Sequence, residues 1–255
     1  MTAESYRDKI FEVSDPDARL RKPDALDEFV AAGGGFAKIA KGTKIRVDEV
    51  RVVPAGARRV ALFVHATPAE GGAALGWTSA NNLDGRFLSE TIGQIPPAAG
   101  ASRFGPNAAW ANGNFLGQVT LVQVVGTDKE IERIAESTCS AFLDMVAAAR
   151  KDGILIGLNS GFRSFPEQKH LHDGFTRRLP GFNPANRPGT SNHQNGIAFD
   201  IDVGGGGSNP VYLWLQKNAT SFGFVRTVRR EAWHWENLPD KAAAAKKRGV
   251  CSTFE

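Results

Sequence analysis

Glycine and proline crowd into one stretch near the middle of the chain, and this stretch limits the folds that the chain can adopt. Such clusters are typical of linkers and long loops. We therefore predict a linker over residues 93–114, with one domain over residues 1–92 and a second over residues 115–255. A chain of 255 residues is long enough for two modest cores. The turn-forming residues of the stretch are Gly93, Pro96, Pro97, Gly100, Gly105, Pro106, Asn107, Asn112 and Gly113.

The first domain has the sequence pattern of an all-β fold. Short β-rich runs, such as Lys44–Val47 and Val60–Val64, are separated by turn residues. No segment before residue 93 shows convincing helical periodicity. We predict a small β-barrel for residues 1–92.

The second domain mixes strand and helix signals without regular alternation. Apolar residues recur at helical spacing from Ile131 to Ala149, and Gly153 follows the expected end of this helix. Thr127 and Glu130 form a capping box ahead of it. The irregular order predicts an α+β domain rather than a doubly wound parallel sheet. Further elements are expected as strands at 119–125, 154–158 and 197–203, and as helices that begin after Ser164, at Pro210 and near Pro239.

The composition excludes two classes of partner. The chain has 31 Lys and Arg residues against 27 Asp and Glu, a net charge of +4, without the dense basic stripes of a nucleic-acid binder. Its apolar runs fall far short of the roughly 18 residues that a membrane span needs. The first residues lack both a basic start and an apolar stretch, so we expect no secretory signal in the chain as given. With only Cys139 and Cys251 available, any metal site must use histidine and carboxylate ligands.

Two histidines stand close to carboxylates in the sequence. His193 precedes Asp200 by seven residues, and His234 follows Glu231 by three. Two imidazoles and one carboxylate form a three-ligand zinc set that leaves a fourth position for water, as a hydrolytic site requires. A carboxylate that is not a ligand can take a proton from that water, and Glu231 is placed for this role. Asp200 and Asp202 point to the same face of a strand, so spacing alone leaves open which of them is the ligand.

The other patterns that could carry chemistry favour ordinary structural roles. His65 lies in an apolar strand and His170 and His172 lie on a predicted helix, so we expect structural or surface positions for all three. The Gly204–Gly207 run lacks the Lys-Ser or Lys-Thr that would follow it in a phosphate-binding loop. The sequence also lacks the His-Glu-x-x-His, Gly-x-Ser-x-Gly and Ser-x-x-Lys motifs of other hydrolases.

Two motifs in the second domain resemble those of a known enzyme family. They are Ser191-x-His193-x-x-Gly196-x-Ala198-x-Asp200 and Glu231-x-x-His234-Trp235. Both resemble the zinc D-alanyl-D-alanine peptidases of the VanX and VanY type, which belong to the wider lysostaphin, D-Ala-D-Ala metallopeptidase and hedgehog group. The stretch Ser160-Gly161-Phe162-Arg163-Ser164 with Gln168 is similar to the Ser-Gly-Tyr-Arg-Ser stretch of VanY-type enzymes.

This resemblance implies a role for each matching residue. It implies that His193, Asp200 and His234 bind Zn2+, and so selects Asp200 over Asp202. It also implies Glu231 as the catalytic base and Arg163 as the cation that faces the developing oxyanion. Ser191 and Gln168 are candidates for hydrogen bonds to the substrate, although Ser191 could equally cap the turn before His193.

The resemblance also implies a fold and a function. The fold is an α+β zinc peptidase domain, an antiparallel sheet flanked by helices, and the order of segments before it resembles a bacterial SH3-like module. The long segments 24–35 and 54–75 depart from that module, and Trp77 could be a core residue or a binding platform. The implied substrate is the peptidoglycan stem peptide of the bacterial cell wall, outside the cytoplasm, and the implied reaction is D,D-carboxypeptidase removal of the terminal D-alanine. The alternatives are an endopeptidase, such as an endolysin or a secreted effector, and a wall-binding module with a relict zinc site.

Overall fold

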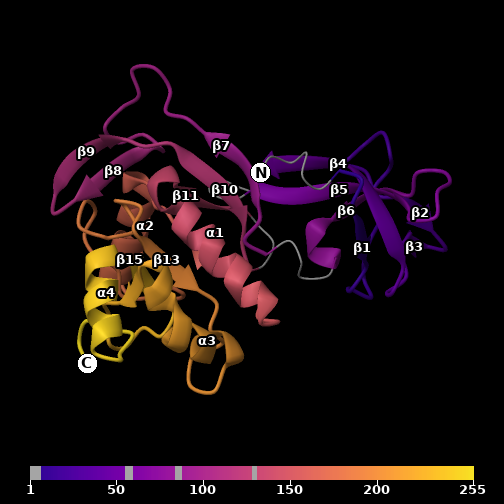
Figure 1. Cartoon of the computed structure of the whole chain (residues 1–255). Coiled ribbons are helices and arrows are strands. Elements are labelled where there is room, and N and C mark those ends of the chain that lie inside the picture. The colour runs from indigo at the N-terminus through magenta and orange to yellow at the C-terminus, as the bar shows by residue number, and fades with distance from the viewer. Residues whose placement is uncertain (1–6, 55–59, 84–87, 128–130) are drawn as a thin grey trace.

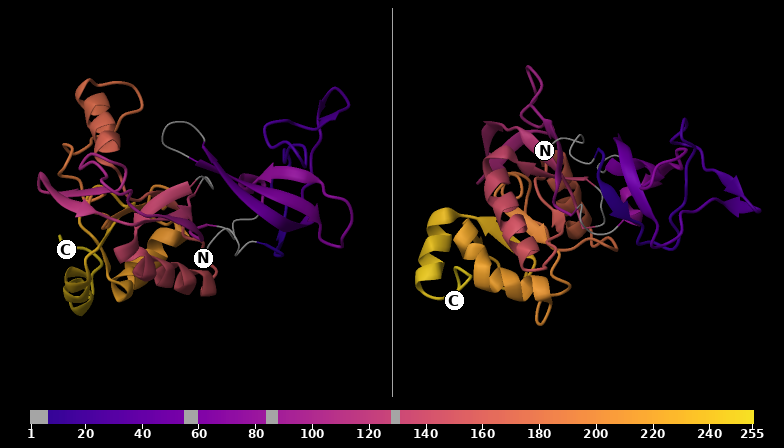
Figure 2. Two further views of the ribbon diagram at one scale, coloured as in Figure 1. Left: turned by 90° about the horizontal axis from the view of Figure 1, so that it is seen from above. Right: turned by 45° about the vertical axis from the view of Figure 1, so that its right-hand side comes forward.

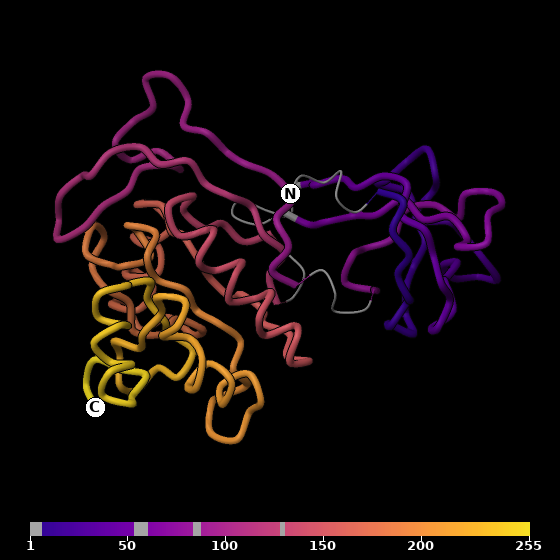
Figure 3. The backbone as a smooth tube through the Cα atoms, viewed as in Figure 1, coloured from indigo at the N-terminus to yellow at the C-terminus, as the bar shows by residue number. Residues whose placement is uncertain are grey.

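The chain folds into an N-terminal β region and a larger C-terminal region that mixes sheets and helices (Figure 1). The structure is a computed structural model that describes residues 7–54, 60–83, 88–127 and 131–255. The two regions can be seen from two further directions in Figure 2, and Figure 3 traces the chain from one region into the other. Among the described residues, no helix combines the length and apolar character needed to cross a membrane.

The N-terminal region is built on a four-stranded antiparallel sheet in the order β1-β4-β5-β6. Its described residues contain no α-helix, so the predicted all-β character is confirmed. Trp77 is 1% exposed and its indole N–H donates to the Pro23 carbonyl, so it is a core residue rather than a platform. The strands are β1 (Ile10–Glu12), β2 (Ala31–Ala32), β3 (Gly35–Phe36), β4 (Lys44–Pro54), β5 (Val60–Pro68) and β6 (Gly76–Ser79), followed by the 3-10 turn η2 (Ala80–Asn82).

The stretch 93–114 is in part the predicted loop, since residues 96–107 form no helix or strand, but its two ends belong to strands. Strand β7 (Thr91–Ile95) pairs with β10 (Leu121–Val125) in a three-stranded sheet completed by β11 (Ile131–Ala135). Strands β8 (Ala108–Ala111) and β9 (Asn114–Gln118) form a hairpin. Its turn is Asn112-Gly113, and both residues have positive φ, as a tight hairpin turn requires. The turn residues of this stretch therefore connect short strands.

Helix α1 (Glu136–Lys151) begins later than the sequence pattern predicts. Residues Ile131–Ala135, expected in its first turns, instead form β11 and pair with β10 from Leu121 to Val125. A short apolar run at spacing three to four fits a strand as well as a helix, and here the pairing with β10 decides. Of the predicted capping box, Glu130 lies outside the described residues. The predicted end is confirmed, because Gly153 follows the helix with φ of 76°.

The C-terminal region contains a second antiparallel sheet in the order β12-β13-β15-β14, flanked by helices. This confirms an α+β arrangement. Phe142 of α1 packs on Phe199 of the sheet with ring centroids 5.1 Å apart, and both side chains are fully buried. Cys139 and Cys251 are both free thiols. The elements are β12 (Leu158–Ser160), α2 (Phe165–Thr176), β13 (Ala198–Ile201), α3 (Pro210–Asn218), the 3-10 helix η4 (Ala219–Phe222), β14 (Phe224–Arg226), β15 (His234–Asn237) and α4 (Pro239–Lys247).

Candidate metal centre

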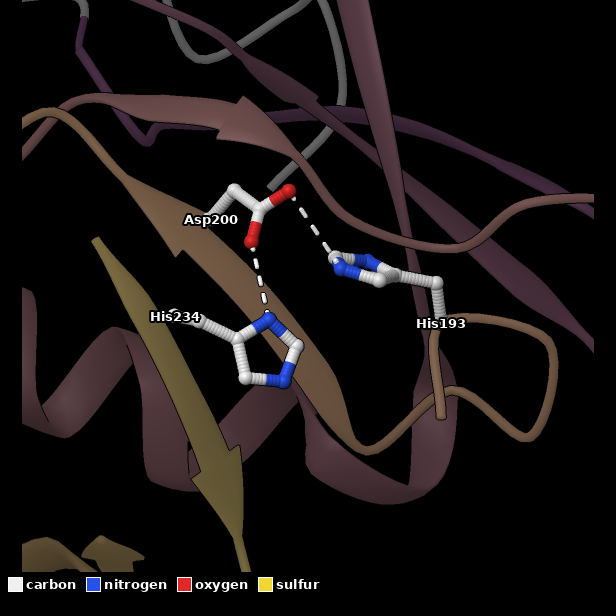
Figure 4. Close-up of side chains that lie close together, drawn as sticks. All are labelled: His193, Asp200 and His234. Atoms are coloured by element: carbon white, nitrogen blue, oxygen red, sulfur yellow. Dashed lines mark hydrogen bonds and ion pairs between the residues drawn. The ribbon is translucent and has the colours of Figure 1, made fainter. Parts of the chain in front are cut away.

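The pairing of two neighbouring strands brings the predicted ligands together. Asp200 of β13 lies directly opposite His234 of β15. Side chains alternate between the two faces of a strand, so these two residues share one face while their buried neighbours Phe199 and Trp235 pack into the core. His193 reaches the same point from the loop that precedes β13, as Figure 4 shows. The sheet therefore places the three residues around one position.

The distances between the three side chains fit a metal site. Asp200 Oδ2 lies 3.3 Å from His193 Nε2, and Asp200 Oδ1 lies 3.0 Å from His234 Nδ1 (Figure 4). One possible ligand atom from each residue lies within 4.8 Å of those of the other two. Two histidines and a carboxylate are the ligand set of several catalytic zinc sites, in which a fourth position stays open.

The loop that carries His193 is shaped by a glycine. Gly196 has φ of 79°, and a Cβ added there would lie 2.4 Å from the Cβ of Ala135, so a larger residue would collide with the end of β11. The hydroxyl of Thr138 donates to the Gly196 carbonyl at 3.1 Å. Helix α1 and β11 thus fix the course of the chain just after His193.

The second nitrogen of each histidine ring also faces an oxygen. His193 Nδ1 lies 2.8 Å from the Gly161 carbonyl, which can only accept, so Nδ1 carries the hydrogen. In neutral His193 the lone pair of Nε2 therefore faces the Asp200 carboxylate. His234 lies between two carboxylates, those of Asp200 and Glu236. A cation held between the two imidazoles and the Asp200 carboxylate would satisfy these acceptors, so the residues present fit a bound metal ion.

The pKa values of the three side chains follow from the same contacts. Burial lowers the pKa of His193 and favours its neutral form. Burial also opposes ionisation of Asp200, but the neighbouring histidines and Arg163 outweigh it and hold the pKa of this carboxyl far below its usual range. Burial disfavours a charged His234 as well, yet hydrogen bonds to Asp200 and Glu236 raise its pKa to about 9. Asp200 is therefore a carboxylate at neutral pH, as a metal ligand must be.

Glu231 and Arg163 lie beside the three predicted ligands. Glu231 Oε2 is 3.9 Å from His234 Nδ1, and its side chain is 35% exposed, so solvent can reach it. Arg163 donates to Asp200 Oδ2 at 2.7 Å and to the Ser160 hydroxyl at 3.0 Å. Sequence reasoning missed that Arg163 contacts a ligand, because nothing in the sequence brings these two positions together.

A cleft of about 850 Å³ opens over the ligands, and all the predicted site residues line it. Gln168 is 1% exposed and donates to the Asn186 carbonyl at 2.8 Å, while its Oε1 has no hydrogen-bond partner among the described residues. Ser191 is buried, and its hydroxyl accepts a long hydrogen bond of 3.4 Å from the His193 backbone N–H. This contact is the turn cap that sequence analysis kept as an alternative for Ser191.

Other candidate residues lie outside this group. Strand β13 ends at Ile201, so Asp202 leaves the strand face and accepts instead from the Gly204 backbone N–H at 3.1 Å. His65 contacts Asp48, His172 contacts the Ala185 carbonyl, and His170 packs against the ring of Phe182. These contacts fit the structural or surface roles predicted for the three histidines.

Glu236 is a site residue that sequence reasoning missed. It is 3% exposed and lines the cleft, and its Oε1 faces His234 Nε2 at 3.1 Å. The signal was present, because Glu236 follows His234 by two residues on a strand and so shares its face.

Comparison with known proteins finds relatives of the C-terminal region. Residues 131–240 match the model of the VanY family, described as D-alanyl-D-alanine carboxypeptidase. The chain is 32% identical over 145 residues to the D-alanyl-D-alanine carboxypeptidase of Enterococcus faecalis, an alignment that covers 47% of this chain and 54% of that protein. The chain spans about half the length of the curated relatives it matches.

Two solved structures are also similar to this chain. VanYB in complex with D-alanine-D-alanine aligns with a TM-score of 0.45 and 27% identity, over 56% of this chain and 92% of that one. A mutant of the D,D-pentapeptidase VanY in complex with Zn(II) aligns with a TM-score of 0.43 and 26% identity, over 62% of this chain and 94% of that one. The three ligands, Glu231 and Arg163 all lie within the segment that matches the family model. Residues 131–240, which contain all of these residues, are therefore the part of the chain that is similar to the VanY family, described as D-alanyl-D-alanine carboxypeptidase.

Proposed function

We propose that this protein is a zinc-dependent D,D-carboxypeptidase that removes the terminal D-alanine from peptidoglycan stem peptides outside the cytoplasm. The observation that carries the proposal is the convergence of His193, Asp200 and His234 in a cleft that also holds Glu231 and Arg163. The family match and the activity named for the Enterococcus faecalis relative support the choice of reaction.

The proposed ligands are His193 Nε2, the Asp200 carboxylate and His234 Nδ1. Zinc suits two nitrogen donors and one oxygen donor with a position left open. Bound there, it supplies Lewis-acid polarisation of a carbonyl and lowers the pKa of a water molecule.

Glu231 is the proposed proton carrier. Its carboxylate takes a proton from the water that attacks the amide carbonyl. The C–N bond of the resulting tetrahedral species then breaks, and Glu231 returns the proton to the leaving amine nitrogen. The partial exposure of Glu231 at the cleft wall supports this role, because substrate and water can both approach it.

Arg163 is proposed to bind the substrate carbonyl oxygen and the negative charge that develops on it. A guanidinium has five N–H groups, so Arg163 can hold Asp200 and Ser160 and still donate to a substrate. One such preorganised donor contributes about 3 kcal/mol to transition-state stabilisation. Gln168 and Ser191 are proposed substrate contacts. Gln168 Oε1 has no hydrogen-bond partner within the described part of the chain, which suits a substrate N–H.

The N-terminal region is proposed to be an SH3-like module, over residues 1–92, that binds wall peptides or steers the catalytic domain. Its all-β content and four-stranded antiparallel sheet support this proposal. The net positive charge of the chain suits an anionic wall.

The proposal is tested by mass spectrometry of products after zinc-loaded protein is mixed with intact peptidoglycan and with soluble stem peptides. We expect release of free D-alanine that a chelator abolishes. Fragments cut inside the stem or the cross-bridge would instead identify an endopeptidase. Zinc and wall binding without any cleavage would identify a relict site.

The variant Glu231→Gln separates chemistry from metal binding. We expect a loss of turnover of about 10²–10⁴-fold, as for removal of a general base. Zinc content should stay at the wild-type value, because Glu231 is not a proposed ligand. Unchanged turnover would refute the role given to Glu231.

A further inference from the structure

Glu236 makes two hydrogen bonds through one oxygen, and each reaches a different side of the metal centre. Its Oε1 lies 3.1 Å from His234 Nε2 and accepts from the Asn192 side-chain amide at 2.8 Å. The Glu236 side chain is 4% exposed, so these contacts are shielded from water. A buried carboxylate in this position needs such partners, because burying an unpaired charge is costly.

The first contact decides which nitrogen of His234 faces the metal. Both ring nitrogens of His234 face carboxylate oxygens, which can only accept. A metal ion bound beside Asp200 would take the place of the hydrogen on Nδ1, while Glu236 keeps the hydrogen on Nε2. Nδ1 is the nitrogen that lies 3.0 Å from Asp200 Oδ1. Without Glu236, the His234 ring could rotate or carry its hydrogen on Nδ1, and either change would remove a ligand atom.

The second contact reaches the loop that carries the other histidine. Asn192 directly precedes His193, and its backbone carbonyl accepts from the Ala198 N–H at 3.2 Å. Through Asn192, Glu236 ties this loop to β15. One carboxylate therefore holds the positions of both imidazole ligands.

Glu236 also completes the charge balance of the centre. The ionisable side chains paired with the ligands are Arg163, Glu231 and Glu236. With Asp200 they carry three formal negative charges and one positive charge. The two negative charges left over match a divalent cation, and loss of Glu236 would leave such a cation only half compensated.

We propose that Glu236 is a positioning residue of the metal centre, which orients His234 for ligation through Nδ1 and holds His193 in place through Asn192. Hydrogen-bonded partners of metal-ligating histidines typically change metal affinity by 10–100-fold when they are removed. This inference rests on the proposed zinc site but not on the proposed reaction.

The test is zinc affinity, measured by competition with a chromogenic chelator at fixed pH. We expect Glu236→Ala to weaken zinc binding by about 10–100-fold. Glu236→Gln keeps an acceptor oxygen but loses the charge, so we expect a smaller loss. Asn192→Ala removes only the link to the His193 loop and should fall between Glu236→Gln and the wild type. The visible absorption of the cobalt-loaded protein should change in Glu236→Ala, because the ligand geometry changes.

A matched control is Glu90→Gln, which removes a carboxylate paired with Arg150 at 2.7 Å outside the cleft. It should bind zinc as the wild type does. Wild-type affinity in a folded Glu236→Ala would overturn the proposal, and if that variant does not fold, wild-type affinity in Glu236→Gln would overturn it. Wild-type protein that binds zinc but cleaves no stem peptide would refute the proposed function and leave the role of Glu236 standing.

Discussion

At the residue scale, the proposed metal centre depends on backbone atoms as well as on its proposed ligands. Gly161 offers the carbonyl that holds His193 Nδ1, and it lies against β11 without room for a side chain. A Cβ at Gly161 would lie 2.2 Å from the Arg133 carbonyl oxygen. That oxygen also accepts from the Phe162 backbone N–H at 2.6 Å. A side chain here would therefore push the Gly161 carbonyl away from His193.

Gly161→Ala is expected to weaken zinc binding by about tenfold or more, since it displaces the hydrogen-bond partner of a ligand. Overpacking of this kind also destabilises by roughly 1–3 kcal/mol. Chelator competition measures the affinity, and thermal unfolding measures the stability. Gly35→Ala is the control, because a Cβ there meets nothing nearer than 3.8 Å and its φ is ordinary. Parental zinc affinity in Gly161→Ala would contradict this account.

Individual residues differ in how far the sequence predicts them. Motif spacing and residue chemistry indicate His193, His234 and a nearby carboxylate, because zinc needs these donor types. The choice between Asp200 and Asp202 needs the end of β13, which short-range spacing does not indicate. The role of Gly161 depends on an approach between distant segments, so no local pattern predicts it.

At the element scale, helix α2 is anchored by a capping box that also reaches β11. Glu167 accepts from the Ser164 backbone N–H at 2.8 Å and pairs with Arg133 of β11. Burial would raise the pKa of Glu167, but Arg133 and the hydrogen bonds from Ser164 outweigh it and hold the pKa below its ordinary value of 4.5. The carboxylate therefore stabilises the fold above that value, and the contribution is lost as the pH falls through the lower pKa of the folded protein.

Glu167→Gln is expected to lower the free energy of unfolding by about 1–3 kcal/mol at pH 7, since it loses charge-assisted hydrogen bonds in a mostly buried position. The difference from the wild type should shrink as the pH falls below 4.5, where the unfolded chain takes up a proton. Urea unfolding of both proteins at several pH values measures this difference in the free energy of unfolding. A difference that stays constant down to pH 3 would show that the charge of Glu167 contributes nothing.

Elements with signals at both ends are those that the sequence predicts well. Ser164, Pro166 and Glu167 mark the start of α2, and Pro210 and Gly223 bracket α3 and η4, all as expected. The start of α1 was predicted wrongly because apolar spacing over 131–135 does not distinguish a strand from a helix. There the pairing with β10, a contact outside the local pattern, determines the structure.

At the scale of the whole molecule, the two regions share one buried cluster. Val125 and Ile131, at the ends of β10 and β11, pack with N-terminal residues that include Ile45 and Leu62. Beside this cluster, the Ser89 backbone N–H donates to the Val125 carbonyl at 2.7 Å, and the Ser89 hydroxyl donates to the Ile156 carbonyl at 2.8 Å. A shared core of this kind makes the two regions stabilise each other, so we expect them to unfold together.

Ile131→Ala tests this coupling, since Ile131 is 4% exposed and belongs to the shared cluster. The cavity should cost about 2–5 kcal/mol. Because the residue belongs to the C-terminal region, the coupling predicts a single calorimetric transition at lower temperature and faster hydrogen exchange in β4 and β5 of the N-terminal region. Leu116→Ala, at a side chain that is 60% exposed, should change neither the unfolding temperature nor the hydrogen exchange of β4 and β5. Two separate transitions, with exchange in β4 and β5 as in the parent, would mean that the regions are independent and that the N-terminal module acts on the zinc domain only as a tether.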